Sequence, residues 1–267
     1  MRLLILGVSV LLLSACTTVS RPKVDLAQVT PGARSSGGAV IGGRGGATVV
    51  FQSGFQEGKE SWRDVLPQVA ATHRVFAYDR PGHGDSAFKK GRRDPCAIAA
   101  EERQLLIANG LNPPYILVGH SLGGLYQYVF ATMYPQDVAG LVLLDPTHPR
   151  HLETLKKESP GSAALLSVVR AVGFSESDKA EFDDQAKCLD QINMRQPVTA
   201  PVKLLVSGRF REEEKGDFEK AVKRLRSDWL KILGIPKFQT VWDSGHYIQN
   251  ENPKAVIDAI RQIGRAE

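Results

Sequence analysis

The sequence has few cysteines, no strong excess of charge of either sign and no long hydrophobic run, and each scarcity excludes a class of protein. Three cysteines in 267 residues are too few for a disulfide-rich scaffold, and without a CxxC pair a structural zinc site has no support. The 34 basic and 29 acidic residues give a net charge of +5 with no basic stripe, so nucleic-acid binding is not indicated. The 42% of hydrophobic residues can bury the core of one domain, which excludes a wholly disordered protein.

The N-terminal hydrophobic run, Leu3–Leu13, is too short to span a bilayer, because a membrane-spanning helix needs about 20 residues. With a positive residue before it and small residues after it, the run predicts an export signal over residues 1–15. Leu13-Ser14-Ala15-Cys16 resembles the lipobox of bacterial lipoproteins, which implies that Cys16 carries fatty acids such as palmitate and anchors the chain to a membrane. The alternative is an ordinary signal peptide cut at the same place. The expected location is the bacterial cell envelope, facing the periplasm or at the outer membrane.

Residues 16–46 are predicted to be a flexible tether between the lipid anchor and a folded domain at 47–267. A lipid-anchored domain needs such a spacer to stand clear of the membrane, and chains rich in glycine behave as flexible coil. Glycine is dense in the second half of the segment, at positions 32, 37, 38, 42, 43, 45 and 46.

Short apolar runs rich in β-branched residues recur from residue 47 onward, and each is stopped by turn residues. Helical patterns, such as residues 97–108 and 124–133, lie between several of them. Alternating strands and helices predict an α/β fold with a mostly parallel, doubly wound sheet, in which function lies at the carboxyl ends of the strands. The expected strands are 48–51, 74–78, 115–118, 141–144, 203–206 and 238–242.

The sequence Gly119-His120-Ser121-Leu122-Gly123 follows one expected strand and opens a helix. At such a turn a serine is held in a strained conformation with its hydroxyl exposed, and flanking glycines avoid collisions. The N-terminus of the helix offers free N–H groups to a developing oxyanion. The alternative is a glycine-flanked turn with an ordinary capping serine.

These residues, together with the loop 79–86 and Asp243-Ser244-Gly245-His246, resemble the α/β-hydrolase fold family over residues 47–267. The resemblance implies that Ser121 is the nucleophile and His246 the general base. Chemistry also supports His246 as the base, because a serine hydroxyl is a weak nucleophile until a base takes its proton. This histidine follows the last expected strand, as the order of residues in this fold requires. In the loop 79–86, Asp79 and Arg80 are expected to bond within the loop and to take no part in catalysis.

The acid that would orient His246 is less clearly marked. Relatives often place it after the strand at 203–206, but Arg211 stands at that position here. Asp145, directly after the strand at 141–144, is the favoured candidate. Glu212 and Asp217 are the alternatives, although the pattern around them predicts that both lie at the solvent-exposed start of a helix.

The oxyanion hole needs two N–H donors. The backbone of Leu122 is expected to supply one, because it follows the nucleophile. The second is expected from Phe55, in the loop Ser53-Gly54-Phe55 that replaces the His-Gly of many relatives.

The insertion at about 146–201 has the length of a small cap, and an apolar helix around 165–172 could cover the pocket. If Cys16 carries lipid, Cys96 and Cys188 remain as an even pair in an oxidising compartment. Both lie beside the catalytic end of the sheet, so a disulfide between them would tie the cap to the core. Two separate thiols are the alternative.

The expected activity is hydrolysis of a small-molecule carboxylic ester or related acyl bond through a Ser-His-acid triad and an acyl-enzyme, with no cofactor and no metal ion. An amide or peptide hydrolase, or a cofactor-free perhydrolase, would use the same residues. The non-enzymatic alternative is a lipid-anchored binding protein on a hydrolase scaffold.

Overall fold

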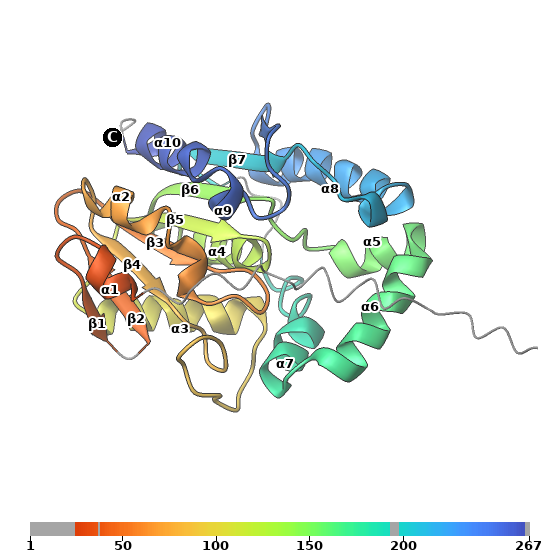
Figure 1. The fold of residues 1–267 in the computed structure, drawn as a ribbon, viewed down its shortest axis with the longest axis horizontal. Coiled ribbons are helices and arrows are strands. Elements are labelled where there is room, and N and C mark those ends of the chain that lie inside the picture. Colours follow the sequence, from red (N-terminus) through yellow and green to blue (C-terminus); the bar gives the residue numbers. More distant parts are fainter. Residues whose placement is uncertain (1–24, 37, 193–197, 265–267) are drawn as a thin grey trace, which may run out of the picture.

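The computed structural model describes residues 25–36, 38–192 and 198–264, and within them the chain forms one eight-stranded sheet (Figure 1). The strands lie in the order β1-β2-β4-β3-β5-β6-β7-β8. All pairings from β4 to β8 are parallel, and β1 and β2 join the edge of the sheet antiparallel, which confirms the predicted mostly parallel α/β fold. The bounds are β1 (Arg34–Ser36), β2 (Ala39–Gly42), β3 (Thr48–Gln52), β4 (Val75–Tyr78), β5 (Tyr115–His120), β6 (Val138–Leu144), β7 (Val202–Ser207) and β8 (Gln239–Val241).

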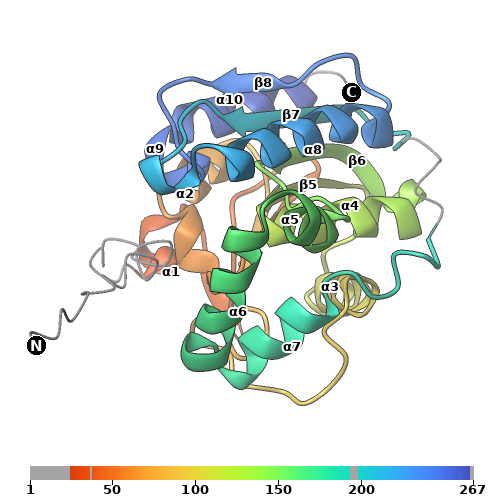
Figure 2. The same cartoon turned by 90° about the vertical axis from the view of Figure 1, so that its right-hand side faces the viewer.

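Helices cover both faces of this sheet, so it is doubly wound as predicted (Figures 1 and 2). One face packs against α3 (Pro95–Ala108), α4 (Leu122–Met133) and α8 (Asp217–Leu233), and the other against α1 (Leu26–Val29), α2 (Leu66–Ala70) and α10 (Pro253–Ile263). The short helix α9 (Ile248–Glu251) precedes α10. Because the central strands β3 and β5 are buried on both faces, they read as continuous apolar runs rather than as alternating patterns.

The prediction of a flexible tether up to residue 46 is wrong for the described part of that segment. Residues 25–46 include α1, β1 and β2, and β2 pairs with β4 along its whole length, with Ala39, Val40 and Ile41 buried. Five of the described glycines there, at positions 32, 38, 43, 45 and 46, have positive φ, and Gly42 lies in β2. Gly43 has a φ of +70°, and a Cβ on it would lie 1.9 Å from the carbonyl oxygen of His73. The folded domain therefore includes residues before 47, whereas the predicted signal and Cys16 lie outside the described residues.

In the described part of the predicted cap between β6 and β7 there are three helices, α5 (His151–Glu158), α6 (Pro160–Gly173) and α7 (Glu176–Asp184) (Figure 2). The expected apolar helix is part of α6, but none of its side chains is buried, and Val172 is 82% exposed. Contacts to the body of the domain come instead from α5, which packs on α8, and from α7. No helix within the described ranges is long and apolar enough to cross a membrane.

A disulfide joins Cys96, in the first turn of α3, to Cys188, just after α7. The Cα atoms lie 6.3 Å apart, and the predicted pairing is confirmed. The bond ties the end of the cap to a helix that packs directly on the sheet.

We expect the Cys96→Ser/Cys188→Ser double variant to be less stable than the wild type by about 2–4 kcal/mol, because a cross-link that closes a long loop restricts the unfolded chain. The two cysteines are 92 positions apart. Guanidinium unfolding with and without a reducing agent measures this difference. Reduction should bring the wild type to the midpoint of the double variant and leave the variant unchanged; equal midpoints for the oxidised wild type and the variant would contradict the stabilising role.

Candidate active site

Ser121 lies in the turn between β5 and α4 with a φ of +52°, a backbone conformation that L-residues rarely adopt. The tight turn needs both flanking glycines. A Cβ on Gly119 would lie 2.5 Å from the carbonyl oxygen of Gly123, and a Cβ on Gly123 would lie 2.3 Å from that of Gln52. The sequence therefore predicts this turn correctly. The conformation of the serine costs on the order of 1–3 kcal/mol and is maintained by the packing around it.

His246 follows β8, and its ring nitrogen Nδ1 lies 3.2 Å from Oδ2 of Asp145, the residue directly after β6. Because a carboxylate only accepts hydrogen bonds, Nδ1 carries the proton and Nε2 is left as the basic nitrogen. The other two candidate acids lie elsewhere. Glu212 pairs with Lys215 at 2.5 Å and Asp217 with Lys220 at 3.2 Å, and both carboxylates are exposed. The structure therefore brings Asp145 to His246 and leaves both alternatives in solvent.

Asp145 is also held by Arg226 of α8, which the sequence analysis missed. Arg226 Nη2 donates to Asp145 Oδ1 at 2.8 Å and to Ser207 Oγ at 2.6 Å. Burial alone would raise the pKa of Asp145, but the hydrogen bond from His246 and the charge of Arg226 hold it well below its usual range. A signal was present, since Arg226 lies four residues after Val222, on the apolar face of an amphipathic helix.

The pKa of His246 shifts in the opposite direction. Burial disfavours the charged ring, but the hydrogen bond and the negative charge of Asp145 outweigh it and raise the pKa above the usual value. This coupling is what a base needs in order to keep a proton that it has taken from a neighbouring hydroxyl.

The loop after β3 runs directly beside the serine. A Cβ on Gly54 would lie 3.3 Å from Ser121 Cβ, and only 2.4 Å from Glu57 Oε2 and 2.9 Å from His120 Nδ1, so a larger residue here would require these side chains to shift. Among the residues that the structure describes, the N–H groups of Phe55 and Leu122 have no hydrogen-bond partner. Both predicted oxyanion donors are thus free to bind a ligand.

A second group of polar side chains lies behind His246 and was not predicted. His120 Nε2 donates to the backbone oxygen of His246 at 2.9 Å, and His120 Nδ1 lies 2.6 Å from Glu57 Oε2. Glu57 also accepts from the N–H of Gly54 at 2.9 Å. Burial would raise the pKa of Glu57, but the neighbouring His120 lowers it. These contacts join the loop that carries His246 to the loop beside Ser121.

A pocket of about 190 Å³ opens at these residues, with Ser121, Asp145 and His246 all in its wall. Helix α8 supplies an apolar side, and the start of the cap supplies His148 and His151. Burial lowers the pKa of each of these two histidines to about 4, so both are neutral near pH 7. The apolar side comprises Phe218, Val222, Leu225 and Trp229.

Among the described residues, one cluster of potential metal ligands is found, formed by Asp94, Cys96 and Cys188. Its two sulfur atoms are bonded to each other, so this cluster offers no thiolate to a metal ion. None of its three residues lines the pocket described above.

Comparison with known proteins is consistent with this geometry. Residues 45–259 match the family described as "Alpha/beta hydrolase family". "Uncharacterized protein YqjL" of Bacillus subtilis (strain 168) is 27% identical over 223 residues, 83% of this chain and 85% of that protein. "Pimeloyl-[acyl-carrier protein] methyl ester esterase" of Neisseria meningitidis serogroup B is 32% identical over 132 residues, about half of each chain (49% and 48%). The solved structure "Epoxide hydrolase CorEH without ligand" superposes with a TM-score of 0.61 at 22% identity, covering 85% of this chain and 94% of the other, which shows the shared fold.

We expect the imidazole of His246 to titrate above about 6.5, the usual value for histidine, and to shift to lower pH in Asp145→Asn, because the variant loses the negative charge that stabilises the protonated ring. NMR titration of the ring protons measures this directly. The Glu212→Gln/Asp217→Asn variant is the matched control and should titrate like the wild type. A shift in the control without one in Asp145→Asn would remove Asp145 as the partner of His246.

Proposed function

The chain belongs to the α/β hydrolase family, and on that premise we propose that it is a serine hydrolase of carboxylic esters or related acyl bonds. The observation that carries the proposal is the meeting of three side chains in one pocket. A serine on a strained strand-to-helix turn shares the pocket wall with a histidine, and that histidine is hydrogen-bonded to a buried aspartate. The curated esterase relative, which matches half of its own length, supports the same class of reaction.

In the proposed mechanism, Ser121 Oγ attacks the carbonyl carbon while His246 Nε2 takes its proton. The oxyanion that forms is bound by the N–H groups of Phe55 and Leu122. Asp145 holds the ring of His246 and stabilises its charged form. His246 then gives the proton to the leaving alcohol, and a water molecule, activated by the same histidine, releases the acid from the acyl-enzyme and regenerates Ser121.

The pocket limits the size of the group bound next to Ser121. A cavity of about 150 Å³ accepts a ligand of the size of benzene, and the pocket here is about 190 Å³, with an apolar side on α8. Esters with a short acyl chain therefore fit the pocket better than long-chain lipids, and p-nitrophenyl acetate and butyrate are the substrates of choice for a first assay.

We expect Ser121→Ala to abolish hydrolysis of these esters with the fold retained, since loss of a triad nucleophile can lower turnover by about 10⁶. A fluorophosphonate probe, which reacts only with an activated serine, should label the wild type and not the variant. Circular dichroism checks the fold. Equal turnover of the two proteins would contradict the role of Ser121, and a wild type that neither hydrolyses esters nor reacts with the probe would favour a non-catalytic binding protein.

We also propose that the protein is a lipid-anchored protein of the bacterial cell envelope. The support is the sequence Leu13-Ser14-Ala15-Cys16 after a short hydrophobic run. A disulfide between the other two cysteines agrees with an oxidising compartment. The folded domain would then act on small esters outside the cytoplasm.

Metabolic labelling with a fatty acid tests the anchor. The wild type should incorporate the label and Cys16→Ser should not, because only Cys16 is placed for lipidation. The Cys96→Ser/Cys188→Ser variant is the control and should be labelled like the wild type. Equal labelling of the wild type and Cys16→Ser, or no labelling of either, would contradict the anchor.

A further inference from the structure

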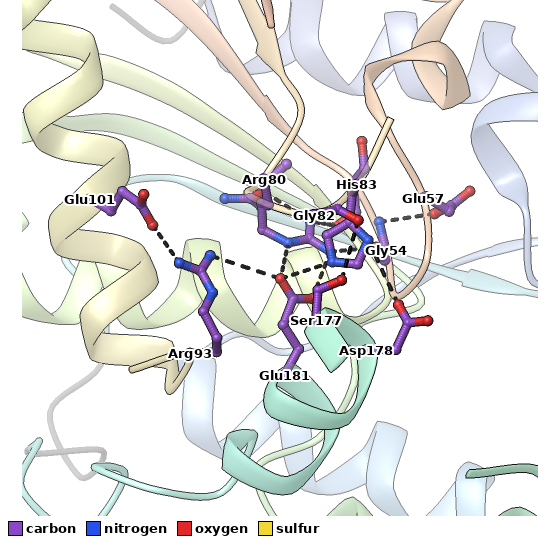
Figure 3. A network of polar contacts seen from close by, with 12 residues as sticks. Gly54, Glu57, Arg80, Gly82, His83, Arg93, Glu101, Ser177, Asp178 and Glu181 are labelled. Atoms are coloured by element: carbon purple, nitrogen blue, oxygen red, sulfur yellow. Dashed lines mark hydrogen bonds and ion pairs between the residues drawn. The ribbon is translucent and has the colours of Figure 1, made fainter. Parts of the chain in front are cut away.

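Arg80, which follows β4, is 1% exposed. The sequence analysis expected it to bond within its own loop, but only its backbone oxygen does so, accepting from the N–H of His83 at 2.9 Å, and its side chain makes its hydrogen bonds outside the loop. All five of its N–H donors have acceptors. Figure 3 shows Arg80 with two of the residues that it contacts, Glu181 and Gly54. Nη2 donates to the carbonyl oxygen of Gly54 at 2.8 Å, and Nη1 to that of Ser53 at 2.6 Å and to Gln52 Oε1 at 3.1 Å. The guanidinium therefore holds three successive residues at the end of β3.

The other side of the guanidinium is held by the cap. Glu181 of α7 receives two hydrogen bonds from Arg80, from Nε at 2.8 Å and from Nη2 at 3.0 Å. Glu181 is fully buried, and His83 Nε2 lies 3.1 Å from its carboxylate. Burial would raise the pKa of Glu181, but the charge of Arg80 outweighs it and lowers the pKa to about 2, so the pair is ionised at neutral pH.

The contact to Gly54 bears on the oxyanion hole because of peptide geometry. The carbonyl of Gly54 and the N–H of Phe55 belong to one planar trans peptide unit and point in opposite directions. A donor fixed on the carbonyl therefore sets the direction of the N–H. A charged donor on the carbonyl also polarises the peptide unit and strengthens the N–H as a donor.

The same loop contacts the cap through two further side chains. The ring of Phe55 packs against Phe174, just before α7, and Phe182, on α7, with ring centroids 4.9 and 6.2 Å apart. Gln56 Nε2 donates to Asp178 Oδ2 at 2.9 Å. Helix α7 is thus a support for the loop that carries the oxyanion donor.

We propose that Arg80 is a positioning residue that aims and polarises the Phe55 N–H of the oxyanion hole, and that Glu181 of α7 holds Arg80 in place. This rests on the proposed function of Ser121. Lysine could not replace Arg80, because an ammonium group has three donors on one atom and cannot span these acceptors in a plane.

The test compares Arg80→Met with Arg93→Met. Arg93 is also buried and also lies against Glu181, with Nη2 3.9 Å from Oε1, but the structure gives it no contact with residues 52–54 among those it describes. Arg80→Met should lower kcat about 10–100-fold with little change in KM, since outright loss of an oxyanion donor costs about 10²–10³. Arg93→Met should keep kcat within about twofold at temperatures where both variants are folded.

Two further measurements separate positioning from stability. The double variant Arg80→Met/Glu181→Leu removes the buried carboxylate left unpaired in Arg80→Met, so it should regain stability without regaining kcat. The ¹⁵N–H resonance of Phe55 should shift in Arg80→Met and not in Arg93→Met. This second readout needs no turnover, so it tests the positioning even if the wild type fails to hydrolyse esters.

Three results would overturn the proposal. Recovery of wild-type kcat in the double variant would show that Arg80 acts only on stability. An equal loss of kcat in Arg93→Met would assign the effect to Glu181 and α7 in general. An unchanged Phe55 resonance in Arg80→Met would show that the guanidinium does not set the direction of this N–H.

Discussion

The close approach of the β5–α4 turn to the end of β3 is the constraint on which the rest of the site depends. A Cβ on Gly123 would lie 2.3 Å from the carbonyl oxygen of Gln52 and 2.4 Å from that of Ser53. Backbone here packs directly on backbone, which leaves the serine between them in a left-handed conformation with its side chain turned outward. The same contact places the Ser53-Gly54-Phe55 loop beside Ser121. One packing arrangement therefore brings together the proposed nucleophile and both N–H donors of the proposed oxyanion hole.

Two buried carboxylates, each paired with two basic side chains, fix the orientation of groups that this backbone packing does not contact. Asp145 lies between His246 and Arg226, and Glu181 lies between Arg80 and His83. In both places the acid is shared, so each cation restricts where the carboxylate can turn. Buried pairs of this kind contribute little net stability after their desolvation, but they permit few alternative geometries. Here these pairs hold the proposed catalytic acid, Asp145, and the loop after β3 in one orientation.

Much of the fold follows from local signals in the sequence. The six apolar runs from residue 48 to residue 242 are all strands. Asn252, a residue type favoured at helix N-termini, caps α10 and accepts from the N–H of Ala255. Strand β2 was missed because its apolar stretch is only Ala39-Val40-Ile41, with glycines on both sides. What makes it a strand is pairing with β4, a contact that no local pattern records.

The polar contacts of the site were predictable only where a motif marks them. Ser121 is identified by its flanking glycines, and Asp145 is identified by its position at the end of a strand. Arg226 meets Asp145 across 81 positions and Arg80 meets Glu181 across 101, and neither pair has a fixed spacing that could be recognised. Side-chain contacts at such separations follow from the tertiary fold, so they become visible only once the strands and the cap are in place.

The cap differs from a simple cover over the pocket. Its last helix, α7, is joined to the domain by the Cys96–Cys188 disulfide at its end and by Glu181 in its middle, whereas α6 has no buried side chain. Because free energies of local opening follow the number of buried contacts, α6 is the part of the cap that moves most easily. The cap therefore combines a fixed support for the proposed catalytic groups, α7, with a loosely packed helix, α6.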